Sequence, residues 1–245
     1  MQLSPNKLRY LAPALVLACG VAIIVPALLR GLPVGADFNN HYRHALPLYD
    51  SLRAGHFDPG WLAESNDGYG DARFRFYPPA TYYLLSATRF VAGDWYAGSL
   101  ITFALLSSVG ALGVFAWGRR LGASRWIAAL AGALYAIAPY HLNELYQASF
   151  LAEYAACAVL PWCFAFTQGV FDSRRSVSRA RDVAGLGLSY AALVLSHLPL
   201  TVIGSLSLGV YALLLARRAR SIKPLAIFAA GVVLGLVASA FYWVG

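Results

Sequence analysis

A short stretch near the N-terminus carries residues whose types and spacing could do chemistry. Asp37, His41 and His44 are spaced i, i+4 and i+7, so a helix that begins near Asp37 puts all three side chains on one face. A carboxylate and imidazoles in this arrangement could share a proton, or a divalent metal with His41 and His44 among its ligands. The alternative is structural: Asp37 is the N-cap of the helix, and the histidines are solvated at a membrane surface.

A second stretch, residues 66–79, alternates arginines with aromatic residues. Its Gly and Asp residues predict a tight turn, and Pro78 and Pro79 predict the start of a helix. Arg73 and Arg75 could hold a lipid phosphate through bidentate hydrogen bonds, with Tyr77 as a further substrate contact. The two arginines could instead anchor the loop on lipid headgroups.

Two further polar residues interrupt apolar segments. Glu153 lies near the start of an otherwise apolar helix, and a carboxylate at membrane depth is costly enough to indicate a functional site. Its position near a helix N-terminus would also be favourable without any substrate. His197 precedes Pro199 at a predicted break between two helices, where it could contact a substrate.

The composition places these residues in a membrane protein. Of the 245 residues, 59% are hydrophobic and 12% are charged, whereas a soluble domain carries about 25% charged residues. The mean hydropathy is +0.59. A soluble enzyme and a disordered chain are therefore excluded. The net charge of +8 does not indicate nucleic-acid binding, because the basic residues form short clusters between apolar runs, as in cytoplasmic loops.

The apolar runs predict seven transmembrane helices with the N-terminus inside. They lie near residues 8–29, 95–118, 125–140, 153–171, 183–197, 199–216 and 224–244. Residues 78–92 are apolar but short, and we interpret them as an interfacial or re-entrant helix. Most of the basic residues then face the cytoplasm, as the positive-inside rule requires: Lys7, Arg9, Arg119, Arg120, Arg125, Arg174, Arg175, Arg179, Arg181, Arg217, Arg218, Arg220 and Lys223.

This topology leaves one long outer loop, residues 31–94, between the first two predicted spans. Loops of this length in a compact protein are usually functional. The predicted fold is thus an all-α integral membrane protein, with residues 1–245 as a single domain and interfacial helices in its first outer loop. We expect this domain to be the front part of a longer protein.

The pattern resembles the C-type glycosyltransferases, polytopic membrane enzymes that use polyprenyl-phosphate-linked sugars. The resemblance lies in the single span followed by an outer loop that opens with Asp37, the Tyr77-Pro78-Pro79 helix start, and the inner turn at residues 118–122. Residues 37–41, 74–79 and 196–199 look closest to bacterial membrane proteins labelled "6-pyruvoyl-tetrahydropterin synthase related", a label that implies no pterin chemistry.

The resemblance implies a function on the outer face of the bacterial cytoplasmic membrane. The catalytic aspartate of the first loop falls on Asp37, and the acidic residue at the outer start of the fourth span falls on Glu153. The implied partners are membrane lipid, a polyprenyl-phosphate sugar and a glycan, lipid or protein acceptor. The sequence does not identify a cofactor; a divalent metal is the one candidate. The competing hypothesis is a non-catalytic lipid or glycan carrier or an assembly scaffold.

Overall fold

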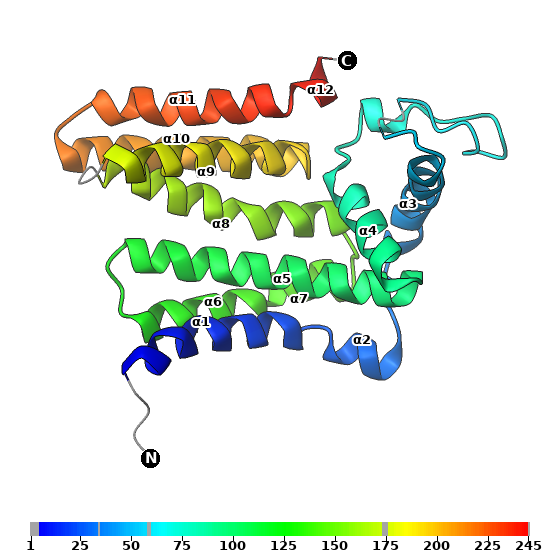
Figure 1. Ribbon diagram of the computed structural model, residues 1–245, viewed down its shortest axis with the longest axis horizontal. Coiled ribbons are helices and arrows are strands. Elements are labelled where there is room, and N and C mark those ends of the chain that lie inside the picture. The colour runs from blue at the N-terminus through cyan, green and yellow to red at the C-terminus, as the bar shows by residue number, and fades with distance from the viewer. Residues whose placement is uncertain (1–4, 34, 58–59, 173–175, 245) are drawn as a thin grey trace.

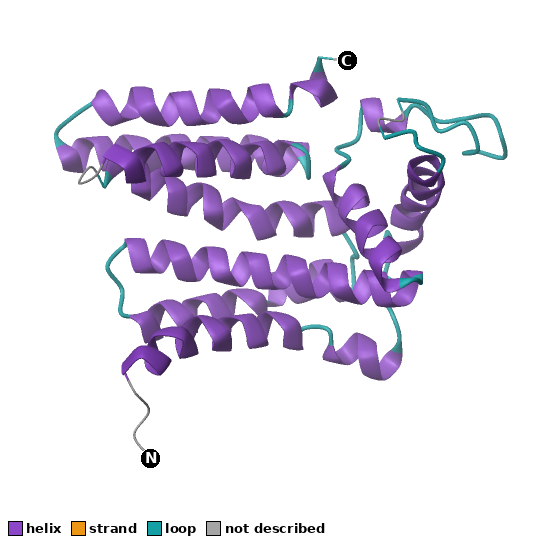
Figure 2. Cartoon of the chain, in the orientation of Figure 1, coloured by secondary structure: helices purple, strands orange, loops and turns teal. Residues whose placement is uncertain are grey.

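The computed structural model describes residues 5–33, 35–57, 60–172 and 176–244. These residues are almost entirely helical (Figure 2), with one isolated antiparallel β-bridge between Leu62 and Asp71. The helices are α1 (Pro5–Ala22), α2 (Val25–Arg30), α3 (Phe38–Arg53), the 3₁₀ turn η1 (Arg73–Arg75), α4 (Ala80–Ala92), α5 (Trp95–Arg120), α6 (Arg125–Ala136), α7 (Pro139–Tyr146), α8 (Leu151–Phe171), α9 (Ser176–Val194), α10 (Leu198–Ala219), α11 (Lys223–Ala238) and α12 (Ala240–Trp243).

The longer helices lie side by side with alternating chain direction (Figure 1). Helix α8 packs between α5 and α9, α5 packs on α1 and α6, and α11 packs on α9. Helices α3 and α4 lie outside this row, at one end of the bundle. We call this end the loop end, because it also holds the chain between α3 and α4.

Prolines and capping residues explain where the helices begin. Proline occupies one of the first two positions of α2, α7, α10 and α11, where its missing N–H costs no hydrogen bond. Asp94 caps α5 by accepting a hydrogen bond from Ala97 N at 2.8 Å, and Ser124 caps α6 through Ile127 N. The predicted break near Pro199 therefore falls between two separate helices, α9 and α10, and Pro139 begins α7.

Among the described residues, four helical segments are long and apolar enough to cross a membrane: Tyr10–Arg30, Trp95–Arg120, Leu151–Phe171 and Leu198–Ala219. Helix α11 is apolar but shorter. The all-helical membrane fold predicted from the sequence is thus supported, and four of the predicted spans meet the length and hydropathy expected of a transmembrane helix.

Basic residues gather at the end of the bundle opposite α3 and α4, where α5 turns into α6 and α10 turns into α11 (Figure 1). We call this the basic end. Arg120 of α5 and Arg218 of α10 line one pocket there, and Arg120 forms an ion pair with Asp182 of α9 at 2.6 Å. Arg174 and Arg175, which are part of the predicted cytoplasmic set, lie outside the described residues.

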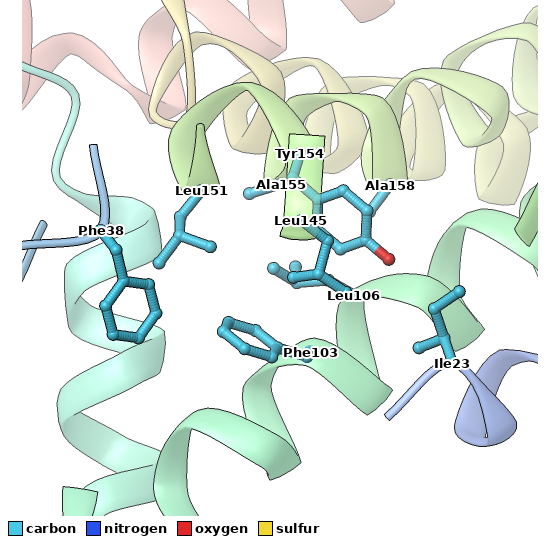
Figure 3. Close-up of a cluster of buried hydrophobic side chains, with 9 residues drawn as sticks. All are labelled: Ile23, Phe38, Phe103, Leu106, Leu145, Leu151, Tyr154, Ala155 and Ala158. Carbon is cyan, nitrogen blue, oxygen red and sulfur yellow. The ribbon is translucent and has the colours of Figure 1, made fainter. Parts of the chain in front are cut away.

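A cluster of buried side chains joins the loop end to the bundle (Figure 3). Phe38 of α3 packs with Phe103 of α5 and Leu151 of α8. Leu145 of α7 and Ile23, which precedes α2, belong to the same cluster. Because Phe38 directly follows Asp37, this packing fixes the start of α3 against the start of α8.

We predict that Gly169→Ala destabilises the basic end. A Cβ atom at Gly169 would overlap Arg120 Nη1 and would lie 2.5 Å from Asp182 Cγ, so it would displace a partly buried ion pair. Disturbing a hydrogen-bonded charge pair of this kind costs about 1–3 kcal/mol. Thermal unfolding in detergent measures the loss, and Gly209→Ala, where a Cβ meets open space, is the matched control. Equal melting temperatures of the two variants would contradict the prediction.

Candidate functional site

A pocket of about 200 Å³ at the loop end collects polar residues from four separate parts of the chain. Asp37 and His41 come from the start of α3, Tyr77 from the turn before α4, Glu153 from the first turn of α8, and His197 from the position before α10. Phe150 and Ala152 complete its lining. Five of the eight residues predicted from the sequence therefore line one pocket.

Asp37 is the N-cap residue of α3, the position that the structural alternative gave it, but its carboxylate makes no capping hydrogen bond to the helix. Instead, Asp37 Oδ1 accepts a hydrogen bond from the Asn40 side chain at 2.8 Å. The Asp37 backbone N–H donates to Ala148 O at 3.1 Å, and Ala36 N–H donates to Gln147 O at 3.2 Å. The segment before α3 is thus tied to the α7–α8 connection, and the carboxylate is available to a ligand.

Gly35 permits this close approach, and we predict that Gly35→Ala separates the two segments. An added Cβ would overlap Ser149 Oγ and lie 2.5 Å from Gln147 O. Amide hydrogen exchange at Ala36 and Asp37 should therefore become faster by about tenfold or more, which corresponds to about 1.4 kcal/mol of opening free energy. Gly209→Ala serves as a control for the glycine-to-alanine change, because nothing lies within 4 Å of a Cβ there and the residue is helical. Unchanged exchange in Gly35→Ala would refute the prediction.

His41 is a buried link between three helices, with 3% of its surface exposed. Its Nε2 atom accepts a hydrogen bond from Leu151 N–H at 3.1 Å, and its Nδ1 atom lies 2.8 Å from the Tyr82 hydroxyl. Because a backbone N–H only donates, Nε2 carries no proton and Nδ1–H donates to Tyr82. Burial lowers the pKa of His41 to about 4, so the ring is neutral at pH 7.

His44 lies behind the pocket and does not line it. Its ring stacks on Tyr82, with 5.2 Å between the ring centroids. Arg73 donates to Nε2 of His44, and Nδ1 is bonded to Asn40 O. Burial is the main cause that lowers the pKa of His44. The arrangement does not fit a metal site on the two histidines, because hydrogen bonds use all four of their ring nitrogens.

More generally, no group of three or more His, Cys, Asp or Glu residues within the described ranges could hold a metal ion.

The two arginines predicted to hold a phosphate bind within the loop instead. Arg73 forms an ion pair with Asp71 at 2.8 Å besides its contact with His44. Arg75 Nε donates to Gly60 O at 3.3 Å. Neither is among the pocket-lining residues. These contacts hold the turn before α4 in place, and with it Tyr77.

Glu153 accepts a hydrogen bond from the hydroxyl of Tyr140 in α7. His197 lies on extended backbone before α10, and its Nδ1 atom is buried with no hydrogen-bond partner among the described residues. Burial lowers the pKa of His197, while Glu153 acts in the opposite direction. The pocket thus holds a carboxylate on α8 whose other oxygen can accept a hydrogen bond, and an imidazole with an unused nitrogen.

Comparison with known proteins identifies the family. A family model described as 6-pyruvoyl-tetrahydropterin synthase related domain, a membrane protein, matches residues 74–245. The chain belongs to this family. No curated protein matches the chain.

The family match covers Tyr77, Glu153 and His197, whereas Asp37 and His41 precede it. The part of the pocket contributed by the 6-pyruvoyl-tetrahydropterin synthase related domain is therefore completed by the start of α3. This agrees with the resemblance seen in the sequence at the level of this family, and it establishes the chain as a membrane protein.

The sequence did not predict a role for Tyr82 at this end of the molecule, and it placed Glu144 in an outer polar stretch together with Glu153 without giving it a role. Tyr82 is fully buried and bonds His41, but a tyrosine in an apolar helix gives no signal of its partner. Glu144 of α7 is 3% exposed, and its Oε2 atom has no partner among the described residues. Burial raises the pKa of Glu144, and Glu153 adds to the effect. The available signal was a carboxylate in the short stretch between two apolar segments, residues 125–136 and 151–171.

Proposed function

We propose that this chain is the membrane domain of a glycosyltransferase. It would move a sugar from a polyprenyl-phosphate donor to a glycan, lipid or protein acceptor at the periplasmic face of a bacterial inner membrane. The observation that supports this most directly is the pocket that joins Asp37, Glu153 and His197 at the loop end. Two carboxylates and an imidazole beside a membrane domain suit chemistry on a lipid-linked polar substrate.

The proposed topology has seven spans, namely α1 with α2, α5, α6, α8, α9, α10 and α11, and an inner N-terminus. Its support is the alternating direction of these helices (Figure 1) and the basic residues at one end. The positive-inside rule then places the basic end in the cytoplasm and the pocket outside. Helices α3 and α4 would lie at the outer interface, between the pocket and the lipid.

Asp37 is the proposed base. An acceptor hydroxyl would attack the anomeric carbon of the donor sugar, and its proton would pass to the Asp37 carboxylate. A bond forms between the acceptor oxygen and the anomeric carbon, while the bond to the phosphate oxygen breaks and polyprenyl phosphate leaves with the electron pair. One displacement of this kind inverts the anomeric configuration. A positioned base contributes about 10²–10⁴-fold to such a rate.

The leaving phosphate needs hydrogen-bond donors, because the described pocket lining contains two carboxylates and neither Lys nor Arg. His197 is the proposed donor within the pocket, since its Nδ1 atom has no partner among the described residues. Arg73 and Arg75 would contribute from the neighbouring turn only by exchanging their loop contacts for the phosphate. Glu153, held by Tyr140, would accept a hydrogen bond from a sugar hydroxyl and orient the donor.

The test uses the complete reading frame reconstituted in liposomes with radiolabelled polyprenyl-phosphate sugars. The wild type should release sugar from the lipid, Asp37→Asn should not, and Glu153→Gln should be slower. If wild type and both variants only move intact donor across the bilayer without sugar loss, the alternative of a non-catalytic carrier is correct.

A further inference from the structure

The turn between α10 and α11 at the basic end forms a second, chemically different pocket. Its volume is about 580 Å³, and three cationic residues line it: Arg217 at the end of α10, Arg220 in the turn and Lys223 at the start of α11. None of its described lining residues is acidic, and the sequence after Asp182 contains neither Asp nor Glu. The pocket is therefore strongly cationic.

Apart from Ser221, the rest of the lining is apolar. Leu213, Ala216 and Leu225 form its sides, and Ile222 at the rim is 78% exposed. Leu213 also faces outward, with 61% of its surface exposed. Cations above an exposed apolar surface are complementary to a lipid headgroup with its acyl chain, and not to a free anion alone.

Local structure does not account for two of the three cations. Arg220 has φ +49°, a left-handed conformation at the end of a helix that glycine adopts without strain. Lys223 begins α11, where the helix dipole disfavours positive charge. Residues that are unfavourable for the local backbone conformation or helix dipole are expected where function requires them. An anion bound in the pocket would stabilise the positive charges of both Arg220 and Lys223.

We propose that this pocket binds the headgroup of an anionic phospholipid. Arg217, Arg220 and Lys223 would contact the phosphate, and the acyl chain would lie along Leu213 of α10. The α10–α11 turn is then held at the membrane surface by a specific lipid. This inference does not depend on the proposed enzymatic function, since it concerns the opposite end of the bundle.

Native mass spectrometry of the detergent-purified protein tests the proposal, with phosphatidylglycerol and phosphatidylcholine of identical acyl chains as probes. The wild type should bind phosphatidylglycerol at least about tenfold more tightly. Arg220→Gly and Lys223→Gln should each weaken this binding about fivefold, since each removes one cation near the phosphate. Arg125→Gln, which removes an exposed cation of the same end from outside this pocket, should have no effect.

Arg220→Gly separates lipid binding from structure, because glycine fits the φ of this position and the melting temperature should be unchanged or higher. Equal binding of both lipids by the wild type, or equal weakening by Arg125→Gln, would overturn the proposal. Binding of soluble glycerol phosphate as tight as that of the lipid would also overturn it, because the apolar surface would then contribute nothing.

Discussion

Asp37→Asn is expected to lower sugar transfer by about 10²–10⁴-fold while the protein keeps its fold. Asparagine has the size of aspartate but cannot take up the acceptor proton. Among the described residues, the Asp37 side chain hydrogen-bonds to Asn40, and this bond can be kept by the amide oxygen of asparagine. The backbone contacts of Asp37 with the α7–α8 connection do not require a carboxylate. The melting temperature should therefore change little.

The measurement is sugar release from labelled donor by protein in liposomes, compared at equal amounts of folded protein. Asp50→Asn is the matched control, because Asp50 is exposed near the other end of the same helix. It should retain the wild-type rate. Asp37→Asn activity within about threefold of the wild type would reject Asp37 as the base.

His41→Ala is expected to reduce the free energy of unfolding by about 3 kcal/mol, because the loss leaves a cavity and two unpaired groups, Leu151 N–H and the Tyr82 hydroxyl. Thermal unfolding in detergent at pH 7.5 measures it. His56→Ala, at an exposed position, should change stability by less than about 0.5 kcal/mol. Equal melting temperatures of His41→Ala and His56→Ala would show that the hydrogen bonds of His41 do not stabilise the fold.

The same histidine predicts a pH dependence of stability. The pKa of His41 is lowered from 6.5 to about 4, so between these values the unfolded chain binds more protons than the folded one. The contribution of His41 is fully present above pH 6.5 and is lost as the pH falls towards 4, by about 3 kcal/mol in all. Melting temperatures of wild type and His41→Ala should therefore converge as the pH falls. A constant difference from pH 7.5 to pH 4.5 would contradict this.

The positions of the helices were easier to predict from the sequence than the side-chain contacts between them. Apolar runs locate α5, α8 and α10 because a membrane helix must be continuously apolar, and the proline at residue 199 marks a break that the structure has. Asp37 was placed correctly at the start of a helix. These features are local, so composition and spacing are sufficient to predict them.

The contacts that build the pocket are not local. His41 bonds the amide of Leu151, far along the chain, and a backbone N–H carries no sequence signal of its partner. The two loop arginines could not be distinguished from phosphate ligands, because an arginine gives the same sequence signal whether it binds a phosphate or a group within the loop, such as Asp71 or the backbone oxygen of Gly60. Spacing placed His41 and His44 on one face but could not show that their nitrogens are already bonded.

The His41–Leu151 hydrogen bond also has a consequence for biosynthesis. A ribosome releases the start of α3 long before α8, and His197 later still, so the pocket cannot assemble while the first loop is being made. Until then, polar groups of the first loop that are buried in the folded protein, such as His41, are exposed to water. Nascent chains arrested before residue 151 should therefore leave the 31–94 segment sensitive to protease, and chains extended beyond residue 197 should protect it.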